Sequence, residues 1–256
     1  MKNQYGTRVV IVTTTFKPKE PNPTEETRWQ LALRTCKTAT QLGYPIIVVD
    51  GSPDPKAKDE LRSTGATVFE QKGTGMGASR REALRHGLAT EAQVIIWTEP
   101  EKESIIWSLH KCVERIIDDG HCVVIPRRTS FKNYPAYQRG SELMGNWDMA
   151  SVTGRHDLDL YIGPRIMDRK AAELMASYEG KGQHGNVYGD KWEILFIPII
   201  WFIMKSWSIV HVNVDYEHPV EQSAEDDFSM REKRDVQRIE LCRAMRLEYS
   251  QWVVNM

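Results

Sequence analysis

Short apolar runs alternate with amphipathic helical segments through the first half of this chain. The run Ile46-Ile47-Val48-Val49 is wholly apolar and β-branched, which is typical of a strand covered on both faces in a parallel sheet. Strands are expected at 8–12, 44–50, 66–69, 93–97 and 122–125, and helices at 24–42, 55–63, 76–88 and 103–118. The alternation predicts an α/β fold, with a mostly parallel sheet covered by helices.

The second half is less regular and more helical. Helices are expected at 137–152, 169–178, 190–205 and 228–252, with one strand at 209–214. Neither an internal repeat nor a low-complexity linker separates the halves. We therefore expect a single domain over 1–256, with a βαβ nucleotide-binding type of half at 1–130 and a closing half at 131–256.

Composition narrows the function classes. The net charge of −1 is weak evidence against a nucleic-acid partner, and the four cysteines lack the spacing of a zinc site or a disulfide framework. The apolar run at 194–204 is too short for the roughly 20 residues that cross a bilayer. The first residues contain no apolar signal region. We expect a cytoplasmic protein without stable membrane insertion.

The segment Trp97-Thr98-Glu99-Pro100-Glu101-Lys102 places two carboxylates where a predicted strand ends. Ligands of open α/β sheets bind beyond the carboxyl ends of the strands. Glu99 and Glu101 are suited to binding a divalent ion, gripping a guanidinium, or serving as acid and base. The purely structural alternative is that acidic residues and a proline begin the next helix.

Two further segments follow predicted strands. Asp50 ends one strand, where it can accept hydrogen bonds from a ribose or base, or cap the helix near Pro55. The glycine-rich loop with Gly75, Gly77 and Arg80 leads into a helix, whose first amides can hold an anion. The glycine spacing matches neither a P-loop nor a dinucleotide motif, so the sequence does not establish an anion site. A close-packed turn with solvated arginines is the structural alternative.

The second half contributes four more candidates. Asp157 and Asp159 lie on one face if their segment is a strand, either in a cleft or at an exposed edge. Asp190 is equally suited to capping a helix and to general-base catalysis. His218, held before a proline at a strand end, is a candidate metal ligand, proton carrier or hydrogen-bond donor.

Together these segments resemble glycosyltransferases of the GT-A architecture, a Rossmann-like fold, in a family 2-like form. The resemblance covers most of the chain, from Val9-Val10-Ile11-Val12-Thr13-Thr14-Thr15 to His218. It implies that Asp50 faces a nucleoside, that Glu99 and Glu101 occupy the metal and diphosphate position, and that Asp190 is the catalytic base. The family's Asp-x-Asp is replaced here by Glu99-Pro100-Glu101, which fits the usual Mg²⁺ geometry poorly.

A GT-A-like chain without that metal motif also looks like the fungal arginine-containing cyclodipeptide synthases. This resemblance makes the leading hypothesis a synthase of cyclo-Arg-Xaa that uses aminoacyl-tRNA, including arginyl-tRNA, with Glu99 or Glu101 on the guanidinium. His218 or Asp190 would deprotonate the attacking amine, and no cofactor is certain. The alternative is a glycosyltransferase that uses a nucleotide sugar with Mg²⁺ or Mn²⁺, and a third hypothesis is an inactive binding scaffold.

The tRNA hypothesis predicts a basic face beside the cleft, because phosphate contacts require local positive charge. The residues expected on that face are Lys17, Lys19, Arg80, Arg81, Arg127, Arg128, Lys132 and Arg139.

Overall fold

One seven-stranded sheet runs through the computed structural model, which describes residues 2–223 and 228–255. The strands are β1 (Val9–Thr15), β2 (Ile46–Asp50), β3 (Thr67–Glu70), β4 (Val94–Trp97), β5 (Val123–Arg128), β6 (Arg165–Asp168) and β7 (Ile209–Val214). Their order is β3-β2-β1-β4-β6-β5-β7. Only β6 is antiparallel to its neighbours β4 and β5, so the predicted mostly parallel α/β sheet is confirmed.

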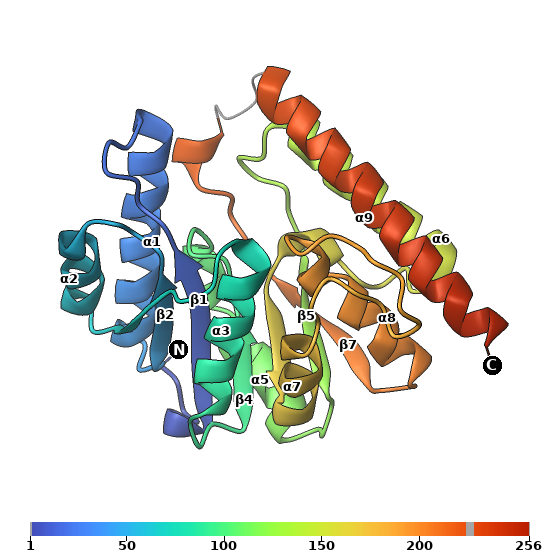
Figure 1. Ribbon diagram of the computed structural model, residues 1–256. Coiled ribbons are helices and arrows are strands. Elements are labelled where there is room, and N and C mark those ends of the chain that lie inside the picture. Colours follow the sequence, from blue (N-terminus) through green and yellow to red (C-terminus); the bar gives the residue numbers. More distant parts are fainter. Residues whose placement is uncertain (1, 224–227, 256) are drawn as a thin grey trace.

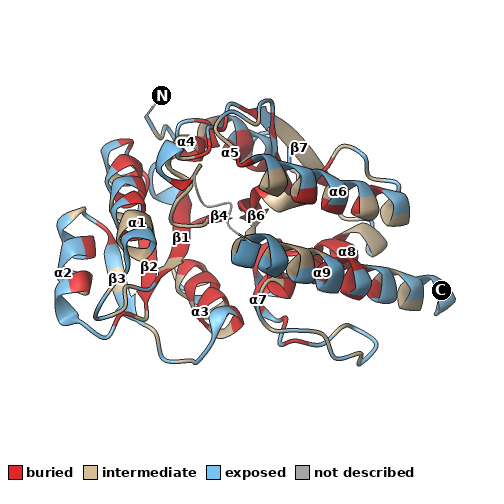
Figure 2. Cartoon of the chain, turned by 90° about the horizontal axis from the view of Figure 1, so that it is seen from above, coloured by how far each residue is buried: buried red, intermediate tan, exposed pale blue. Residues whose placement is uncertain are grey.

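Helices cover both faces of the sheet, as Figures 1 and 2 show. They are α1 (Pro23–Gln41), α2 (Pro55–Ser63), α3 (Met76–Leu88), α4 (Glu103–Ile106), α5 (Leu109–Ile117), α6 (Ala136–Thr153), α7 (Arg169–Ala176), α8 (Ile197–Met204) and α9 (Phe228–Val254). Short 3₁₀ turns are η1 (Gly6–Arg8), η2 (Leu160–Ile162), η3 (Glu193–Leu195) and η4 (Val220–Gln222). Helices α1, α4 and α5 lie on one face, and α3, α7 and α8 lie on the other.

Local chemistry explains where several helices begin. Asn22 caps α1 in a capping box with Glu25, while the side chains of Asp54 and Asp168 accept backbone N–H bonds at the starts of α2 and α7. Helix α3 instead begins after Gly75, whose φ of 91° lies in the left-handed region that glycine tolerates. The glycine-rich loop is therefore a backbone requirement of the strand-to-helix turn.

Three expected elements differ in the structure. The segment 103–118 forms two helices, α4 and α5, and the helix expected at 190–205 begins only at Ile197, after η3. Residues 157–164 form a loop containing η2, and the strand β6 begins at Arg165. Its four residues are sandwiched between β4 and β5, and so short a strand has too little periodicity to be recognised in sequence.

Helices α6 and α9 lie side by side and extend beyond the sheet (Figures 1 and 2). The C-terminal half of α9 is anchored by Glu248, which is fully buried. Its carboxylate accepts hydrogen bonds from Trp201 Nε1 at 2.6 Å and from Tyr188 Oη at 3.0 Å. No helix within 2–223 and 228–255 is long and apolar enough to cross a membrane.

Candidate functional site

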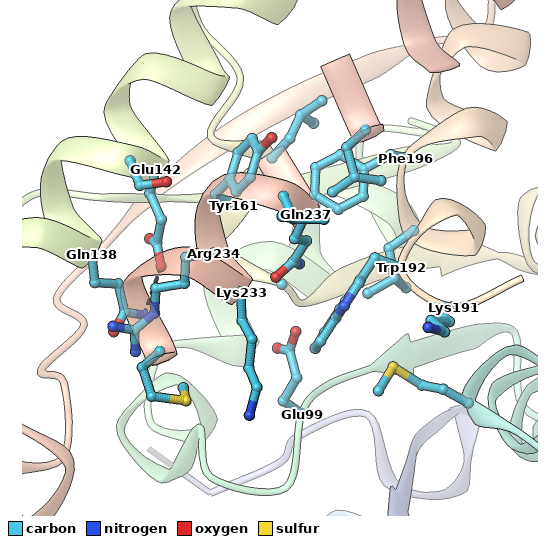
Figure 3. Close-up of a pocket in the computed structure, with 18 of the residues that line it drawn as sticks. Glu99, Gln138, Glu142, Tyr161, Lys191, Trp192, Phe196, Lys233, Arg234 and Gln237 are labelled. Atoms are coloured by element: carbon cyan, nitrogen blue, oxygen red, sulfur yellow. Dashed lines mark hydrogen bonds between the residues drawn. The ribbon is translucent and has the colours of Figure 1, made fainter. Parts of the chain in front are cut away.

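A pocket of about 880 Å³ lies beyond the carboxyl end of β4. Glu99, Glu101 and Lys102 reach it from the loop after β4, and His218 reaches it from the loop after β7. Helices α6 and α9 and the segments around η2 and η3 supply the other walls. These walls include Gln138, Glu142, Tyr161, Lys191, Trp192, Phe196, Lys233 and Gln237, shown in Figure 3.

Glu99 is directed into this pocket (Figure 3). Its Oε2 atom is buried and has no hydrogen-bond partner among the described residues. The carboxylate lies against Gly163, because a β-carbon on that glycine would come within 1.9 Å of Oε2. A buried carboxylate oxygen without a donor is energetically unfavourable, so this atom is suited to accepting a hydrogen bond from a ligand.

Three cations interact electrostatically with Glu99: the buried Arg80 and Arg165, and the partly buried Lys102. Their hydrogen bonds go to other groups, and Arg80 Nε has no partner among the described residues. Arg80 Nη1 donates to the Lys191 carbonyl at 2.8 Å, and Lys102 Nζ donates to Tyr216 Oη at 3.1 Å. The Arg165 guanidinium donates to backbone carbonyls, including that of Leu160 at 2.7 Å. These cations balance the charge of Glu99 without satisfying its Oε2 atom.

Arg80 also shapes one wall of the pocket. Its guanidinium lies 4.5 Å from the centre of the Trp192 ring and 5.4 Å from that of Trp97. Burial lowers the pKa of Arg80 to about 10, which leaves it charged at neutral pH. The arginine expected to be solvated or to bind an anion is therefore an internal support for Trp192.

The pKa values of the other two ionisable candidates in the pocket, Glu101 and His218, are shifted in opposite directions. Burial raises the pKa of the Glu101 carboxyl, which brings it closer to neutral pH. Burial, reinforced by the charge of Lys102, lowers the pKa of His218 to about 3. Neither ring nitrogen of His218 has a hydrogen-bond partner within the described part of the chain. His218 is neutral at physiological pH and is better suited to hydrogen bonding than to proton transfer.

Asp50 lies outside the pocket and is fully buried. Its carboxylate accepts hydrogen bonds from Thr15 Oγ1 at 2.7 Å, from Ser52 Oγ at 2.7 Å and from Ser52 N at 3.1 Å. These bonds join the ends of β1 and β2. Asp50 does not cap α2, since Asp54 performs that role.

Asp190 also lies outside the pocket lining, and it fills the glycine-rich loop. A β-carbon on Gly77 would come within 2.0 Å of its Oδ1 atom, and the Gly77 N–H donates to the Asp190 carbonyl at 3.1 Å. Arg81 Nη2 donates to Asp190 Oδ2 at 2.9 Å, beside a second bond from Nη1. The loop start is therefore occupied by the chain itself, and Asp190 does not cap α8.

Asp157 and Asp159 do not share a cleft. Asp157 pairs with Arg155 at 2.8 Å and with His211 at 3.3 Å, on a separate surface hollow of about 390 Å³. Asp159 is buried and accepts a hydrogen bond from Arg128 Nε at 2.6 Å. Both aspartates are engaged in ion pairs, and neither lines the larger pocket.

Most of the cations expected on a basic face have partners within the protein. Lys17 pairs with Glu26 at 3.2 Å, and Lys132 pairs with Glu217 at 2.7 Å. Arg80, Arg81 and Arg128 are engaged inside the protein as described above. Five of the eight cations expected to meet phosphates are thus held by the protein itself.

Several pocket residues had no signal in the sequence. Lys233 and Gln237 belong to a charged helix, which is typical of a solvated face, yet the structure turns this part of α9 toward Glu99 (Figure 3). Tyr161 and Trp192 lie in irregular segments without periodicity. Trp192 and Tyr161 were each close to a candidate, since they follow Asp190 and Asp159 by two positions.

Comparisons with solved structures identify the architecture. The crystal structure of Mycobacterium tuberculosis glucosyl-3-phosphoglycerate synthase matches 91% of this chain and 80% of its own, with a TM-score of 0.60 and 14% identity. Its complex with Mn²⁺, UDP and glucosyl-3-phosphoglycerate matches 91% and 79% of the two chains, with a TM-score of 0.60 and 13% identity. No protein-family model and no curated protein matches the chain. The fold is GT-A-like.

The residues in the pocket do not fit a divalent metal held by the protein. Within the described ranges, no group of three or more His, Cys, Asp or Glu side chains could hold a metal ion. Glu99 also lies among three cations, two of them buried, which oppose the approach of a doubly charged ion. We therefore derive no catalytic step through a metal.

Proposed function

We propose that the protein is a glycosyltransferase that transfers a sugar from a nucleotide-sugar donor to a small acceptor. The observation that carries this proposal is the position of the Glu99 pocket, at the carboxyl end of a central strand in a GT-A-like fold. Support comes from a similar fold seen in complex with Mn²⁺, UDP-glucose and phosphoglyceric acid.

The donor phosphates would lie at the pocket rim, beside Lys191 and Lys233. Both lysines line the pocket and are exposed, and neither forms a salt bridge in the described part of the chain. Ammonium groups are ordinary phosphate ligands and would supply the positive charge that this site does not take from a metal.

The acceptor would attack the anomeric carbon of the donor. A bond forms between the acceptor heteroatom and that carbon, while the bond from the carbon to the diphosphate oxygen breaks and the nucleoside diphosphate leaves. Glu101 would take the acceptor proton, because its raised pKa makes it a stronger base than an ordinary glutamate. Glu101 lines the pocket and follows Glu99 by two positions in the loop after β4.

Thermal unfolding and turnover test the proposal directly. UDP-glucose and GDP-glucose, each with EDTA, should raise the melting temperature of the wild-type protein and should release nucleoside diphosphate when an acceptor library is added. Lys191→Gln/Lys233→Gln should remove the shift, whereas Lys37→Gln, on the exposed surface of α1, should keep it. The absence of any shift with a nucleotide sugar would contradict the proposal.

A second candidate is the aminoacyl-tRNA-dependent synthase of arginine-containing cyclodipeptides. The internal use of Asp50 and of the Gly77 loop counts against a nucleotide sugar at those two places, and the pairing of five expected cations counts against tRNA. The amine of one aminoacyl group would attack the ester carbonyl of another, forming an amide as the tRNA hydroxyl leaves. A second such attack closes the ring.

Incubation with arginyl-tRNA and a mixture of other aminoacyl-tRNAs tests this candidate. Cyclic dipeptides detected by mass spectrometry would establish it and would displace the glycosyltransferase proposal. Their absence, together with nucleotide-sugar turnover, would exclude it. If neither substrate class binds, the inactive scaffold becomes the better explanation.

A further inference from the structure

We infer that the protein forms a two-fold symmetric dimer, in which the helix pair α6/α9 of one copy packs face to face and antiparallel on the same pair of a second copy. Both helices extend beyond the sheet, and exposed residues run along each of them (Figures 1 and 2). The surface is defined without reference to any substrate, so this inference is independent of the proposed function.

Helix α6 carries an apolar stripe on its exposed side. Leu143, Met144 and Trp147 are all exposed, and 70% of the Trp147 surface is accessible. With Gly140 they follow the spacing i, i+3, i+4 and i+7, which is that of a helix face packed against a neighbour. The side of α6 that is buried within the subunit is another one, which consists of Ser141, Gly145, Met149 and Ala150. A contiguous exposed apolar stripe is typical of an interaction surface.

Helix α9 carries a second stripe, in which two charged residues lie between two apolar ones. Val236, Glu240, Arg243 and Leu247 are all exposed and follow the spacing i, i+4, i+7 and i+11. Neither Glu240 nor Arg243 forms an ion pair in the described part of the chain. Both charges are therefore available to a partner.

The two stripes lie at the same level, because α6 and α9 run parallel. Tyr137 Oη donates to Asp235, and farther along Arg246 Nη2 donates to Asp148 Oδ1 at 3.0 Å. Both hydrogen bonds join residues 98 positions apart in the chain. A two-fold axis that crosses α9 between positions 241 and 242 therefore crosses α6 between positions 143 and 144. Both points lie near the middle of their helices, so the helices of two copies overlap along their length.

This axis makes the α9 stripe complementary to itself, as an interface between identical subunits requires. It places Glu240 opposite Arg243 of the partner subunit, and by symmetry the same ion pair forms twice. It also places Val236 opposite Leu247 of the partner subunit, so each ion pair is flanked by an apolar contact. Val236 and Glu240 line the pocket as well, so the second copy would border the mouth of the pocket.

The same axis makes the α6 stripe complementary to itself. Leu143 lies opposite Met144 of the partner subunit. Gly140 lies opposite Trp147 of the partner subunit, and nothing within the subunit comes within 4 Å of a β-carbon built at this glycine, which leaves room for the indole. A lipid surface would match the apolar residues of α6 but not the paired charges of α9. One axis that satisfies both stripes favours a second copy of this chain as the partner.

Light scattering during gel filtration tests the dimer. The wild type should have twice the mass of the 29.5 kDa chain. Trp147→Glu should be monomeric, because dimerisation would bury its carboxylate against an apolar helix face. A circular dichroism spectrum like that of the wild type shows that this variant is folded. The control Arg62→Glu, on the exposed surface of α2, should stay dimeric. A monomeric wild type or a dimeric Trp147→Glu would overturn the inference.

Charge-reversed variants test the register of the two copies. Glu240→Arg brings like charges together across the axis, and so does Arg243→Glu, so each variant should raise the dimer dissociation constant by roughly tenfold or more in analytical ultracentrifugation. An equimolar mixture of the two variants restores opposite charges and should recover the dimer, which contacts within one helix cannot achieve. A mixture without this recovery would refute the proposed pairing. Binding of a monomeric wild type to phosphatidylglycerol vesicles, lost in Trp147→Glu, would assign the α6 stripe to a membrane instead.

Discussion

The carboxylate of Glu99 lies against the backbone of Gly163, where a β-carbon would come within 1.9 Å of one oxygen and 2.2 Å of the other. Gly163 has a φ of 100°, a conformation that other residues rarely adopt. Two requirements therefore meet at this glycine: the turn between η2 and β6, and the position of the carboxylate in the pocket.

Gly163→Ala is expected to lower the free energy of unfolding by about 1–3 kcal/mol, because of backbone strain, and to lower turnover by displacing Glu99 in the pocket. Urea unfolding and the nucleotide-sugar turnover assay measure the two effects. The control is Gly140→Ala, at an exposed position in α6 with no atom within 4 Å of the new carbon. Gly140→Ala should raise the free energy of unfolding by no more than about 1 kcal/mol. A Gly163→Ala variant as stable as Gly140→Ala would refute the role given to Gly163.

Arg128 is expected to be among the most important charged residues for stability. Its side chain is fully buried and pairs with Asp159 and Glu142. Arg128→Met leaves two largely buried carboxylates without their partner, so the free energy of unfolding should fall by about 3–5 kcal/mol. Arg62→Met, which removes an exposed pair with Asp59, should cost less than about 1 kcal/mol. Similar losses of unfolding free energy in Arg128→Met and Arg62→Met, measured by urea unfolding, would contradict the larger role given to Arg128.

Acid should destabilise the fold through His218. Its pKa of about 3 in the folded protein is lower than the ordinary value of 6.5, so below pH 6.5 the unfolded state binds more protons. This contribution to stability is complete above pH 6.5 and is lost as pH falls toward 3; between pH 7 and 5 the loss is roughly 2 kcal/mol. His218→Gln should reduce the pH dependence of urea unfolding by that amount. An unchanged dependence would mean that His218 is not buried in its neutral form.

Glu101 should govern the acid side of the pH–rate profile. Its pKa is raised above the ordinary 4.5 by burial, and only the deprotonated carboxylate can accept a proton. Activity is therefore expected to fall as pH decreases through a value above 4.5, and Glu101→Gln should lower kcat by about 10²–10⁴-fold. Glu91→Gln should match the wild type. An acid limb retained in Glu101→Gln, with kcat unchanged, would assign the base to another residue.

Residue patterns were sufficient for the regular parts of the fold. The apolar run before Asp50 and the alternation around it predicted a parallel sheet, because burial on both faces leaves a continuous β-branched signature. Glu99, Glu101 and His218 were candidates because each follows a strand, and all three reach one pocket. Their chemical roles remain predictions.

The sequence did not show which hydrogen-bond donors pair with the candidate carboxylates. Asp50, Asp159 and Asp190 had the residue types of ligand-binding groups. Asp50 instead binds Thr15 and Ser52, while Asp159 and Asp190 bind Arg128 and Arg81. A carboxylate that binds a substrate and one that binds a neighbouring arginine look alike in a linear chain. Only the three-dimensional arrangement decides which donors come within hydrogen-bonding distance.

The sequence by itself determined the sheet-and-helix alternation and the strand-end position of Glu99, because both depend on short-range periodicity. Tertiary structure alone decided that β6 enters the sheet antiparallel and that α9 walls the pocket. It also decided that Glu99 keeps an oxygen without a donor while three cations lie nearby. These features depend on contacts between residues far apart in the chain, whose geometry no local pattern specifies.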